Sequence, residues 1–253
     1  VIGVKSHHAT SAEDKYKVDV VTSLHFDLGA HSREEVEAAG VHIGCPVCYR
    51  PSFTSLMDGL VAGTSVDNRG NCAALIGIAE ALARSRPPAT VHLVGTVWEE
   101  FSLRGAVFAA RRLKPALAIC LDVALSGDTP DLSSRYAPRL SNGPTVTLYH
   151  FHGRGTLNGT IAHEGLYRHA LACAKEMDIH LQEAASLGIW TDLAYVQMEG
   201  DYIAGLDMGF PVRYTHTPIE TCDPSDIDKL VRLVTHMAGR IGKDFPIHRL
   251  GAV

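Results

Sequence analysis

The sequence predicts an α/β protein, a three-layer sandwich with a mainly parallel central sheet, preceded by a small β-rich domain with the pattern of a barrel. From residue 59 onward, apolar segments of strand length alternate with segments of helical periodicity. Residues 1–58 have a different pattern, in which short segments of alternating apolar and polar residues are interrupted by Gly, Pro and Ser. A chain of 253 residues that is 46% hydrophobic and 20% charged is also long enough to bury a full core.

A small β-rich domain, such as a barrel, is expected at residues 1–58. Its strand-like pieces are short and alternate between apolar and polar residues, as the strands of a small barrel do. Residues 32–39 form the one helical segment expected there, because Ser32 and Glu35 match the Ser-x-x-Glu pattern of a capping box.

The α/β domain is expected at residues 59–253. A helix is predicted at 71–85, where Leu75, Ile78 and Leu82 share one face. Asp223 followed by Pro224 predicts the start of a closing helix at 225–241. The other expected elements are strands at 90–98, 116–121, 145–151, 179–182 and 201–206, and helices at 103–113, 160–177 and 190–198.

Charge and cysteine usage exclude several classes of protein. The formal net charge of −5 indicates neither a nucleic-acid partner nor an anionic membrane surface. No apolar stretch is long enough to cross a bilayer, and the first residues do not resemble a signal peptide. The six cysteines are scattered, and Cys45 and Cys48 form a CxxC pair without a second pair at zinc-finger spacing. We therefore expect a cytoplasmic protein with reduced thiols.

The most informative feature for function is the pair Glu99-Glu100, which directly follows the strand predicted at 90–98. Neighbouring side chains on an extended segment point in opposite directions. One carboxylate can therefore bind a metal while the other takes a proton from water. The alternative is structural, because acidic residues are also common at exposed helix starts, where they favour the helix dipole.

Three further residues favour the catalytic interpretation. Asp67, Asp122 and His216 each lie at the edge of a predicted strand, helix or loop, where functional groups gather in α/β sheets. Carboxylates and an imidazole on converging loops suit two divalent ions, with zinc, cobalt or manganese favoured over metals that prefer thiolates. Each residue also has a structural alternative: Asp67 as a helix cap, Asp122 as a turn residue and His216 as a hydrogen-bonded loop histidine.

Several motifs together resemble one family, the TET-type dinuclear metalloaminopeptidases, which include glutamyl aminopeptidases and cellulase-M-like proteins. The resemblance covers essentially the whole chain and implies a zinc-exopeptidase-like fold, in which residues 1–58 correspond to the family's β-barrel insert domain, incomplete in this chain. The motifs occur in the family's order and are Gly63-Thr-Ser-Val-Asp67-Asn-Arg69, Val97-Trp-Glu99-Glu100-Phe-Ser-Leu-Arg-Gly105-Ala, Asp122, Gly188-Ile-Trp-Thr-Asp192 and Pro211-Val-Arg-Tyr-Thr-His216-Thr-Pro-Ile-Glu220.

The resemblance implies a role for each site residue. Asp67 would bridge two metal ions, Glu100 and His216 would complete one metal, and Asp122 would bind the other. Glu99 would be the general base that deprotonates a metal-bridging water and then protonates the leaving amine. Asp192 would contact the substrate amine, or it would help to orient the metal ligands without binding the metal itself. The resemblance also implies an unusual backbone at Asp67-Asn68, such as a cis peptide.

One departure from the family's pattern concerns the remaining metal-binding histidine. In the family it lies in a His-x-Asp motif upstream of the barrel insert, and we expect this chain to begin inside the insert and to lack that segment. His25-Phe-Asp27 imitates the motif, but its flanks resemble a strand of the insert.

The leading expectation is a metal-dependent aminopeptidase that acts on short peptides and assembles as a homo-oligomer, such as the family's tetrahedral dodecamer. Two alternatives belong to other classes. One is an inactive or weakly active family member that serves as an assembly or binding protein. The other is a metallohydrolase of a different amide, because a fold does not fix a substrate.

Overall fold

The computed structural model describes residues 1–153 and 157–248. The chain forms two compact units, Val1–Cys48 and Tyr49–Val253. Among the described residues, no helix has both the length and the apolarity needed to cross a membrane.

The first unit contains little regular structure. Strands β1 and β2 pair antiparallel, and Ser32 caps α1 by accepting the backbone N–H of Glu35 at 3.2 Å, as the sequence predicts. The β-barrel of the insert is not confirmed, because β1–β2 is the one strand pair within residues 1–48, and two short strands cannot enclose a core. The elements are β1 (Ile2–Gly3), η1 (His7–Ala9), η2 (Val21–Ser23), β2 (His25–Phe26) and α1 (Arg33–Ala38).

The second unit is built on two sheets. The smaller one has the strand order β10-β4-β3 and is antiparallel. It includes residues 53–55, which the sequence analysis had assigned to the insert. Its elements are β3 (Phe53–Ser55), the turn η3 (Met57–Gly59), β4 (Val61–Gly63) and β10 (Glu220–Cys222).

The larger sheet is mixed, which corrects the mainly parallel sheet expected from the sequence. Its strand order is β5-β9-β6-β7, and β8 also pairs with β6. The pairs β5–β9 and β6–β8 are parallel, whereas β6 pairs antiparallel with both β9 and β7. The alternation of helices and strands could not reveal these antiparallel pairs, because the direction of β6 depends on which neighbours it joins. The strands are β5 (Leu117–Leu125), β6 (Thr145–Phe151), β7 (Gly159–Ile161), β8 (Gln182–Leu187) and β9 (Ala204–Val212).

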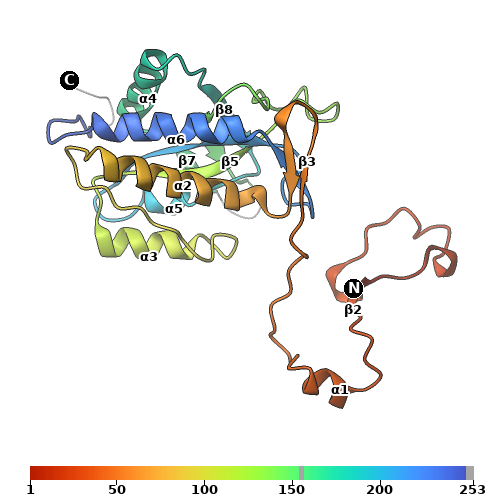
Figure 1. Ribbon diagram of the computed structural model, residues 1–253. Coiled ribbons are helices and arrows are strands. Elements are labelled where there is room, and N and C mark those ends of the chain that lie inside the picture. The colour runs from red at the N-terminus through yellow and green to blue at the C-terminus, as the bar shows by residue number, and fades with distance from the viewer. Residues whose placement is uncertain (154–156, 249–253) are drawn as a thin grey trace. The chain divides into compact units, whose positions relative to one another are not determined.

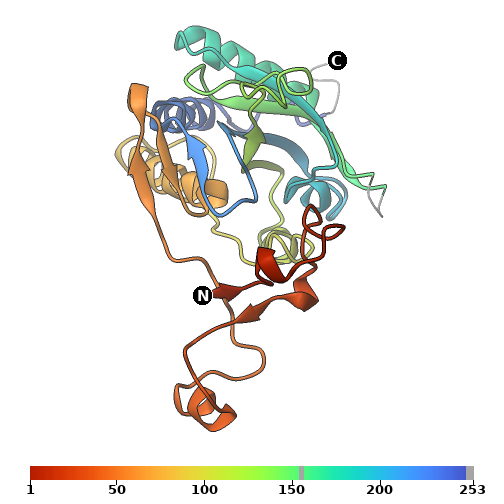
Figure 2. The same cartoon turned by 90° about the vertical axis from the view of Figure 1, so that its right-hand side faces the viewer.

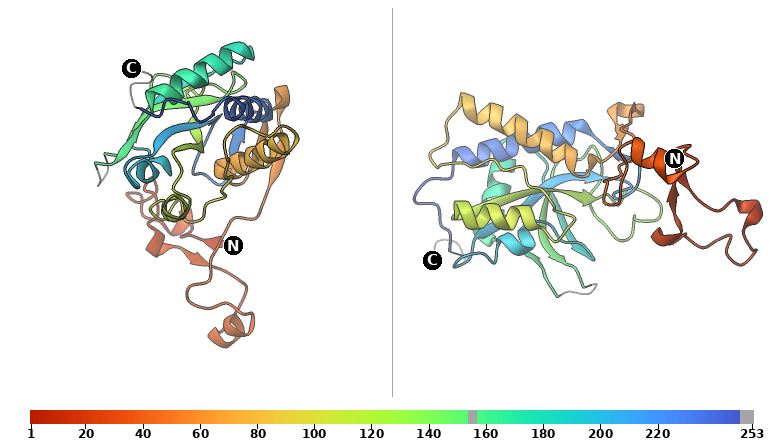
Figure 3. Two further views of the ribbon diagram at one scale, coloured as in Figure 1. Left: turned by 90° about the vertical axis from the view of Figure 1, so that its left-hand side faces the viewer. Right: turned by 90° about the horizontal axis from the view of Figure 1, so that it is seen from below.

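Helices cover both faces of this sheet, as expected for a three-layer sandwich. Figure 1 shows α2 and α6 on one side and α3 with α5 on the other, and Figure 2 shows these helices nearly end-on. The view from below in Figure 3 separates the same layers. The helices are α2 (Val66–Arg84), α3 (Arg104–Leu113), α4 (Glu164–Glu176), α5 (Leu193–Val196) and α6 (Pro224–Gly239).

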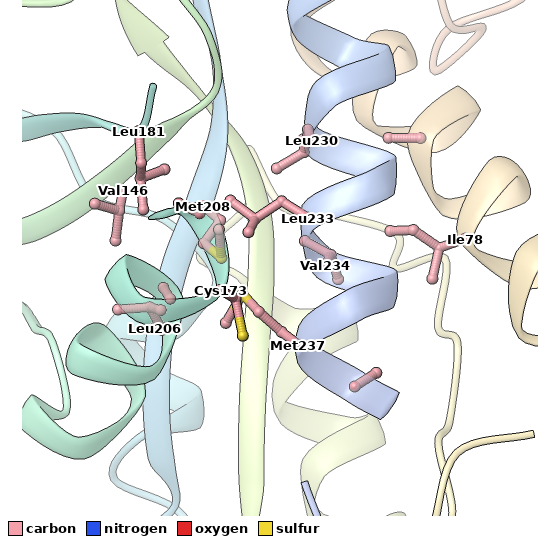
Figure 4. Packing of buried hydrophobic residues seen from close by; sticks show 14 of the residues in the cluster. Ile78, Val146, Cys173, Leu181, Leu206, Met208, Leu230, Leu233, Val234 and Met237 are labelled. Carbon is pink, nitrogen blue, oxygen red and sulfur yellow. The ribbon is translucent and has the colours of Figure 1, made fainter. Parts of the chain in front are cut away.

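The core has one apolar cluster on each face. Alternate residues of β5 divide between them: Leu117, Ile119 and Leu121 pack on the larger cluster, and Ala118 and Cys120 on the smaller. In Figure 4, α6 directs Leu233 and Met237 toward the sheet and α4, while Val234 lies nearer to Ile78 of α2. Asp223 caps α6 by accepting the N–H of Ser225 at 2.8 Å, as the sequence predicts.

The strand predicted at 90–98 is absent, although the segment is apolar. Val91, Leu93, Val94 and Val97 are 38–62% exposed, and no described strand pairs with them. A strand is stabilised by its neighbours, so apolar composition alone does not produce one. Glu99 and Glu100 consequently follow an irregular segment.

Several predicted boundaries also differ from the structure. The strand predicted at 116–121 continues to Leu125, because its parallel register with β9 runs unbroken from Leu117↔Ala204 to Leu125↔Val212. The helix predicted at 160–177 begins at Glu164, because 159–161 pair with β6 as β7. Pairing likewise shifts the strands predicted at 179–182 and 201–206 to β8 and β9, and the helix predicted at 190–198 shortens to α5.

A buried titratable pair lies within the larger sheet. Asp207 of β9 is 2% exposed, and the Thr191 hydroxyl, which lies 2.8 Å from both carboxylate oxygens, donates its proton to that carboxylate. His150 of β6 lies 3.9 Å from it, which is too long for a hydrogen bond. Burial raises the pKa of Asp207 to about 7 and lowers the pKa of His150 to about 4. Both side chains are therefore neutral between about pH 4 and pH 7.

Gly70→Ala should test the packing of α2 on the sheet. A Cβ at Gly70 would meet the Phe210 ring at 2.3 Å, and Phe210 is fully buried. Although Ala favours a helix, the clash should lower the free energy of unfolding by about 1–3 kcal/mol. Gly239→Ala is the matched helical control, because its Cβ meets nothing within 4 Å, and it should be neutral or stabilising by up to about 1 kcal/mol. Equal unfolding midpoints in urea would contradict the packing argument.

The buried pair predicts opposite pH dependences for two variants. Folding raises the pKa of Asp207, so the contribution of Asp207 to the free energy of unfolding falls as the pH rises from about 4 to 7. Folding lowers the pKa of His150, so the contribution of His150 rises between about pH 4 and pH 6.5. Relative to wild type, Asp207→Asn should gain free energy of unfolding with increasing pH, and His150→Asn should lose it. Urea titrations between pH 4.5 and 6.5 measure both, and slopes of the same sign would refute the neutral pair.

Candidate metal centre

A tight turn holds Glu99 and Glu100 before α3. The N–H of Leu103 donates to the Glu99 carbonyl at 2.8 Å, and the N–H of Gly105 donates to the Val97 carbonyl at 3.0 Å. Any side chain at Gly105 would approach that carbonyl at 2.2 Å, which explains why glycine stands there. The turn leaves Glu100 exposed and Glu99 partly buried, so the two carboxylates occupy different environments.

Asp67 lies at the start of α2, where the backbone is not helical. Its ψ is 106°, and the Asp67–Asn68 peptide bond is cis, which confirms the unusual backbone predicted there. The Asn68 side chain donates to the Leu121 carbonyl of β5 at 2.9 Å and accepts from Asn71 at 2.7 Å. The bond to Leu121 attaches the residue next to Asp67 to the central sheet, and the bond from Asn71 attaches it to α2.

His216 reaches the same point from the loop between β9 and β10. Its Nε2 lies 3.2 Å from Asp67 Oδ2 and 3.3 Å from Glu100 Oε1. One ligand atom from each of the three residues lies within 4.8 Å of the others. His216 adopts a left-handed backbone with φ of 62°. This conformation is uncommon for a non-glycine residue and occurs often at functional sites.

Asp122, Glu99 and Asp192 adjoin this cluster. Asp122 is a residue within β5 and does not end the strand, which corrects its predicted position. Asp192 precedes α5, and its Oδ2 accepts the hydroxyl of Thr96 at 2.9 Å. Its Oδ1 is buried without a hydrogen-bond partner in the described part of the chain. These three acids are not members of the cluster formed by Asp67, Glu100 and His216, but their charges interact with it: Asp67 and Glu99 act on Asp122, and Glu100 and Asp192 act on Glu99.

Burial and mutual repulsion raise the pKa values of these acids. Burial, with repulsion by Glu220, raises the pKa of Asp67 to about 6, although the nearby His216 opposes the shift. Burial, with repulsion by Glu100, raises the pKa of Glu99 to about 8. The pKa of Asp122 lies well above its usual value, because of burial and then the charge of Asp67. Each shift marks a carboxylate whose negative charge is poorly balanced by the protein.

This donor set fits divalent cations. Two carboxylate oxygens and an imidazole nitrogen already surround a common point, and the adjoining acids supply more negative charge than the single His216 can balance. Carboxylate and imidazole ligands suit zinc, cobalt and manganese. The metal-binding roles of Asp67, Glu100, Asp122 and His216 remain predictions, as does the proton-transfer role of Glu99.

Glu220, for which the sequence predicts no role, lies beside two of these residues. Glu220 accepts the backbone N–H of Asp67 and that of His216, each at 2.8 Å. Its place at the end of the motif that contains His216 was the available signal, but an acid at the start of a short strand does not by itself indicate burial or a contact with Asp67.

Comparison with known proteins identifies the family. Residues 1–233 match the model of the M42 glutamyl aminopeptidase family. The chain belongs to this family. This agrees with the resemblance carried by the Asp67, Glu99-Glu100 and His216 motifs.

Individual relatives match over nearly the whole chain. SgcX of Escherichia coli (strain K12) is 36% identical over 246 residues, covering 97% of this chain and 66% of SgcX. The solved TET aminopeptidase of a marine sediment Thaumarchaeota archaeon is similar with a TM-score of 0.88 and 26% identity, over 96% of this chain and 67% of that one. The TET1 peptidase of Pyrococcus horikoshii, which can assemble into a tetrahedron or a large octahedral shell, has a TM-score of 0.72 and 25% identity over 91% and 65% of the two chains. This chain thus spans about two thirds of the length of SgcX.

Divalent cations should stabilise the folded protein through this cluster. At a hundredfold excess over the dissociation constant, Zn²⁺, Co²⁺ or Mn²⁺ should add about 2.7 kcal/mol to the free energy of unfolding. His216→Ala should lose most of this gain, whereas His31→Ala, which removes an exposed histidine of the first unit, should keep it. Thermal unfolding with and without each cation measures the effect, and an equal gain in all three proteins would place cation binding elsewhere.

Proposed function

We propose that this chain carries catalytic residues of a metal-dependent aminopeptidase that removes N-terminal residues from short peptides. The observation that carries the proposal is the convergence of Asp67, Glu100 and His216 on one point, with Glu99 beside them in a different environment. Membership of the M42 glutamyl aminopeptidase family supports the same reaction.

Each carboxylate of the Glu99-Glu100 turn has its own role in this proposal. Two divalent cations held by Asp67, Glu100, His216 and Asp122 would polarise the peptide carbonyl and make water more acidic. Glu99 takes a proton from the attacking water and later delivers it to the departing amine. Its partial burial suits this role, because a carboxylate with a raised pKa is a stronger base.

Asp192 is proposed to support Glu99 or to contact the substrate amine. Its negative charge contributes to the raised pKa of Glu99, and the hydroxyl of Thr96 fixes one of its oxygens. The other oxygen has no hydrogen-bond partner among the described residues, so it retains the capacity to accept from an ammonium group.

We also propose that the protein is a homo-oligomer. The assembly of the similar TET1 peptidase into closed shells supports this. Light scattering of the purified protein measures the mass of the assembly.

Glu99→Gln and Glu100→Gln should separate proton transfer from metal binding. Glu99→Gln keeps the size of the side chain but removes the base, so turnover of aminoacyl-anilides should fall by about 10²–10⁴-fold while bound metal is retained. Glu100→Gln removes a charged ligand and should lower metal content first, with excess metal restoring part of the activity.

The measurements are made on the natural full-length protein, with metal content and turnover determined on the same samples. Glu80→Gln, an exposed position on α2, is the control for the same chemical change and should leave both quantities unchanged. Equal metal loss in Glu99→Gln and Glu100→Gln, reversed in both by excess metal, contradicts the division of roles. A wild type that binds metal but cleaves no aminoacyl-anilide refutes the proposed substrate.

A further inference from the structure

Glu220 joins the backbones of two candidate ligands with a single carboxylate. It is the first residue of β10 and is 2% exposed. Its Oε2 accepts the N–H of Asp67 at 2.8 Å, and its Oε1 accepts the N–H of His216 at 2.8 Å. Both oxygens therefore make short, charge-assisted hydrogen bonds to main-chain groups.

Neither of these N–H groups is satisfied by regular secondary structure. Asp67 stands in the first turn of α2, where backbone N–H groups have no intrahelical acceptor. His216 lies in a loop and has a left-handed φ of 62°. Without Glu220, both groups would need another acceptor in a partly buried region.

The geometry beyond these bonds connects Glu220 to the site itself. The two bonded residues are far apart in the sequence, yet their side chains meet at 3.2 Å. β10 is anchored independently, because it pairs with β4 in the register Glu220↔Gly63, four residues before Asp67. A paired strand thus presents one carboxylate to both segments.

A direct role as a ligand fits Glu220 less well. It is not a member of the cluster formed by Asp67, Glu100 and His216, and each of its oxygens already accepts a backbone N–H. Glu220 therefore contacts the site through these two backbones, and it also adds negative charge beside Asp67.

We propose that Glu220 is a positioning residue that sets the spacing of Asp67 and His216 for a divalent cation. Because the cation belongs to the proposed function, this inference rests on the proposed function. The spacing of the two side chains, however, is a property of this chain alone and can be measured without any cation.

Glu220→Gln tests the proposal with little change in size. The amide offers one acceptor and places an N–H₂ group against the second backbone N–H, so one of the two bonds is lost together with the charge. Affinity for Zn²⁺, measured by calorimetry, should fall about 10–100-fold, as expected when a group that orients metal ligands is removed. The visible absorption of bound Co²⁺ should also change, because it reports ligand geometry.

Asp226→Asn is the matched control. Asp226 is fully buried at the start of α6, and its carboxylate also accepts two backbone N–H groups, from Ser141 at 2.8 Å and from Gly143 at 2.7 Å. This variant should lose stability as Glu220→Gln does, but it should keep the wild-type Zn²⁺ affinity and Co²⁺ spectrum. Equal losses of affinity in the two variants would reduce Glu220 to a general structural role and overturn the proposal.

A crystal structure of metal-free Glu220→Gln gives a second, independent result. The separation of His216 Nε2 and Asp67 Oδ2 should increase beyond the present 3.2 Å. An unchanged separation overturns the proposal, whatever cation the wild type binds. A wild type that binds Zn²⁺ but hydrolyses no peptide refutes the proposed function and leaves the role of Glu220 standing.

Discussion

Repulsion among carboxylates that β5, the start of α2 and the turn before α3 contribute is the constraint on which the candidate site depends. Asp67, Glu99 and Asp122 all have raised pKa values because they are removed from water and lie near one another. His216 is the basic side chain within ion-pair distance of Asp67 and Glu100. Carboxylates held this close repel one another, and a bound cation would remove that repulsion. The charge pattern and the donor geometry therefore both indicate a cation site.

The scaffold must hold these groups together against that repulsion, and it does so mainly through backbone contacts. Asn68 bonds to the Leu121 carbonyl of β5, Gly105 permits the close turn that carries Glu99, and Glu220 binds the N–H groups of Asp67 and His216. The apolar clusters on the two faces of the sheet fix the strands and helices to which these contacts attach. Rigid elements of this kind hold a site more accurately than flexible loops would.

The sequence predicted the helices well where a cap or a breaker marks their ends. The closing helix begins at Asp223 as its Asp-Pro signal indicates, and Ser32 caps α1 as its capping box indicates. Strands were predicted less well, because pairing is not local: the apolar segment before Glu99 has no strand partner in the described part of the chain, and β6 runs antiparallel to β9. The candidate ligands could be predicted because several motifs of the metalloaminopeptidase family occur in this sequence in the family's order. Glu220 was not assigned, because its role is visible only when two backbone N–H groups, distant in sequence, point at one carboxylate.

The central claim is that the cluster formed by Asp67, Glu100 and His216 is a cation site. Diffraction data from crystals soaked in Zn²⁺, recorded on both sides of the zinc absorption edge, test it most directly. An anomalous peak about 2.0–2.2 Å from Asp67, Glu100 and His216 Nε2 is the predicted result. Strong zinc peaks at other residues, such as Cys45 and Cys48, with none at this cluster, would contradict the account.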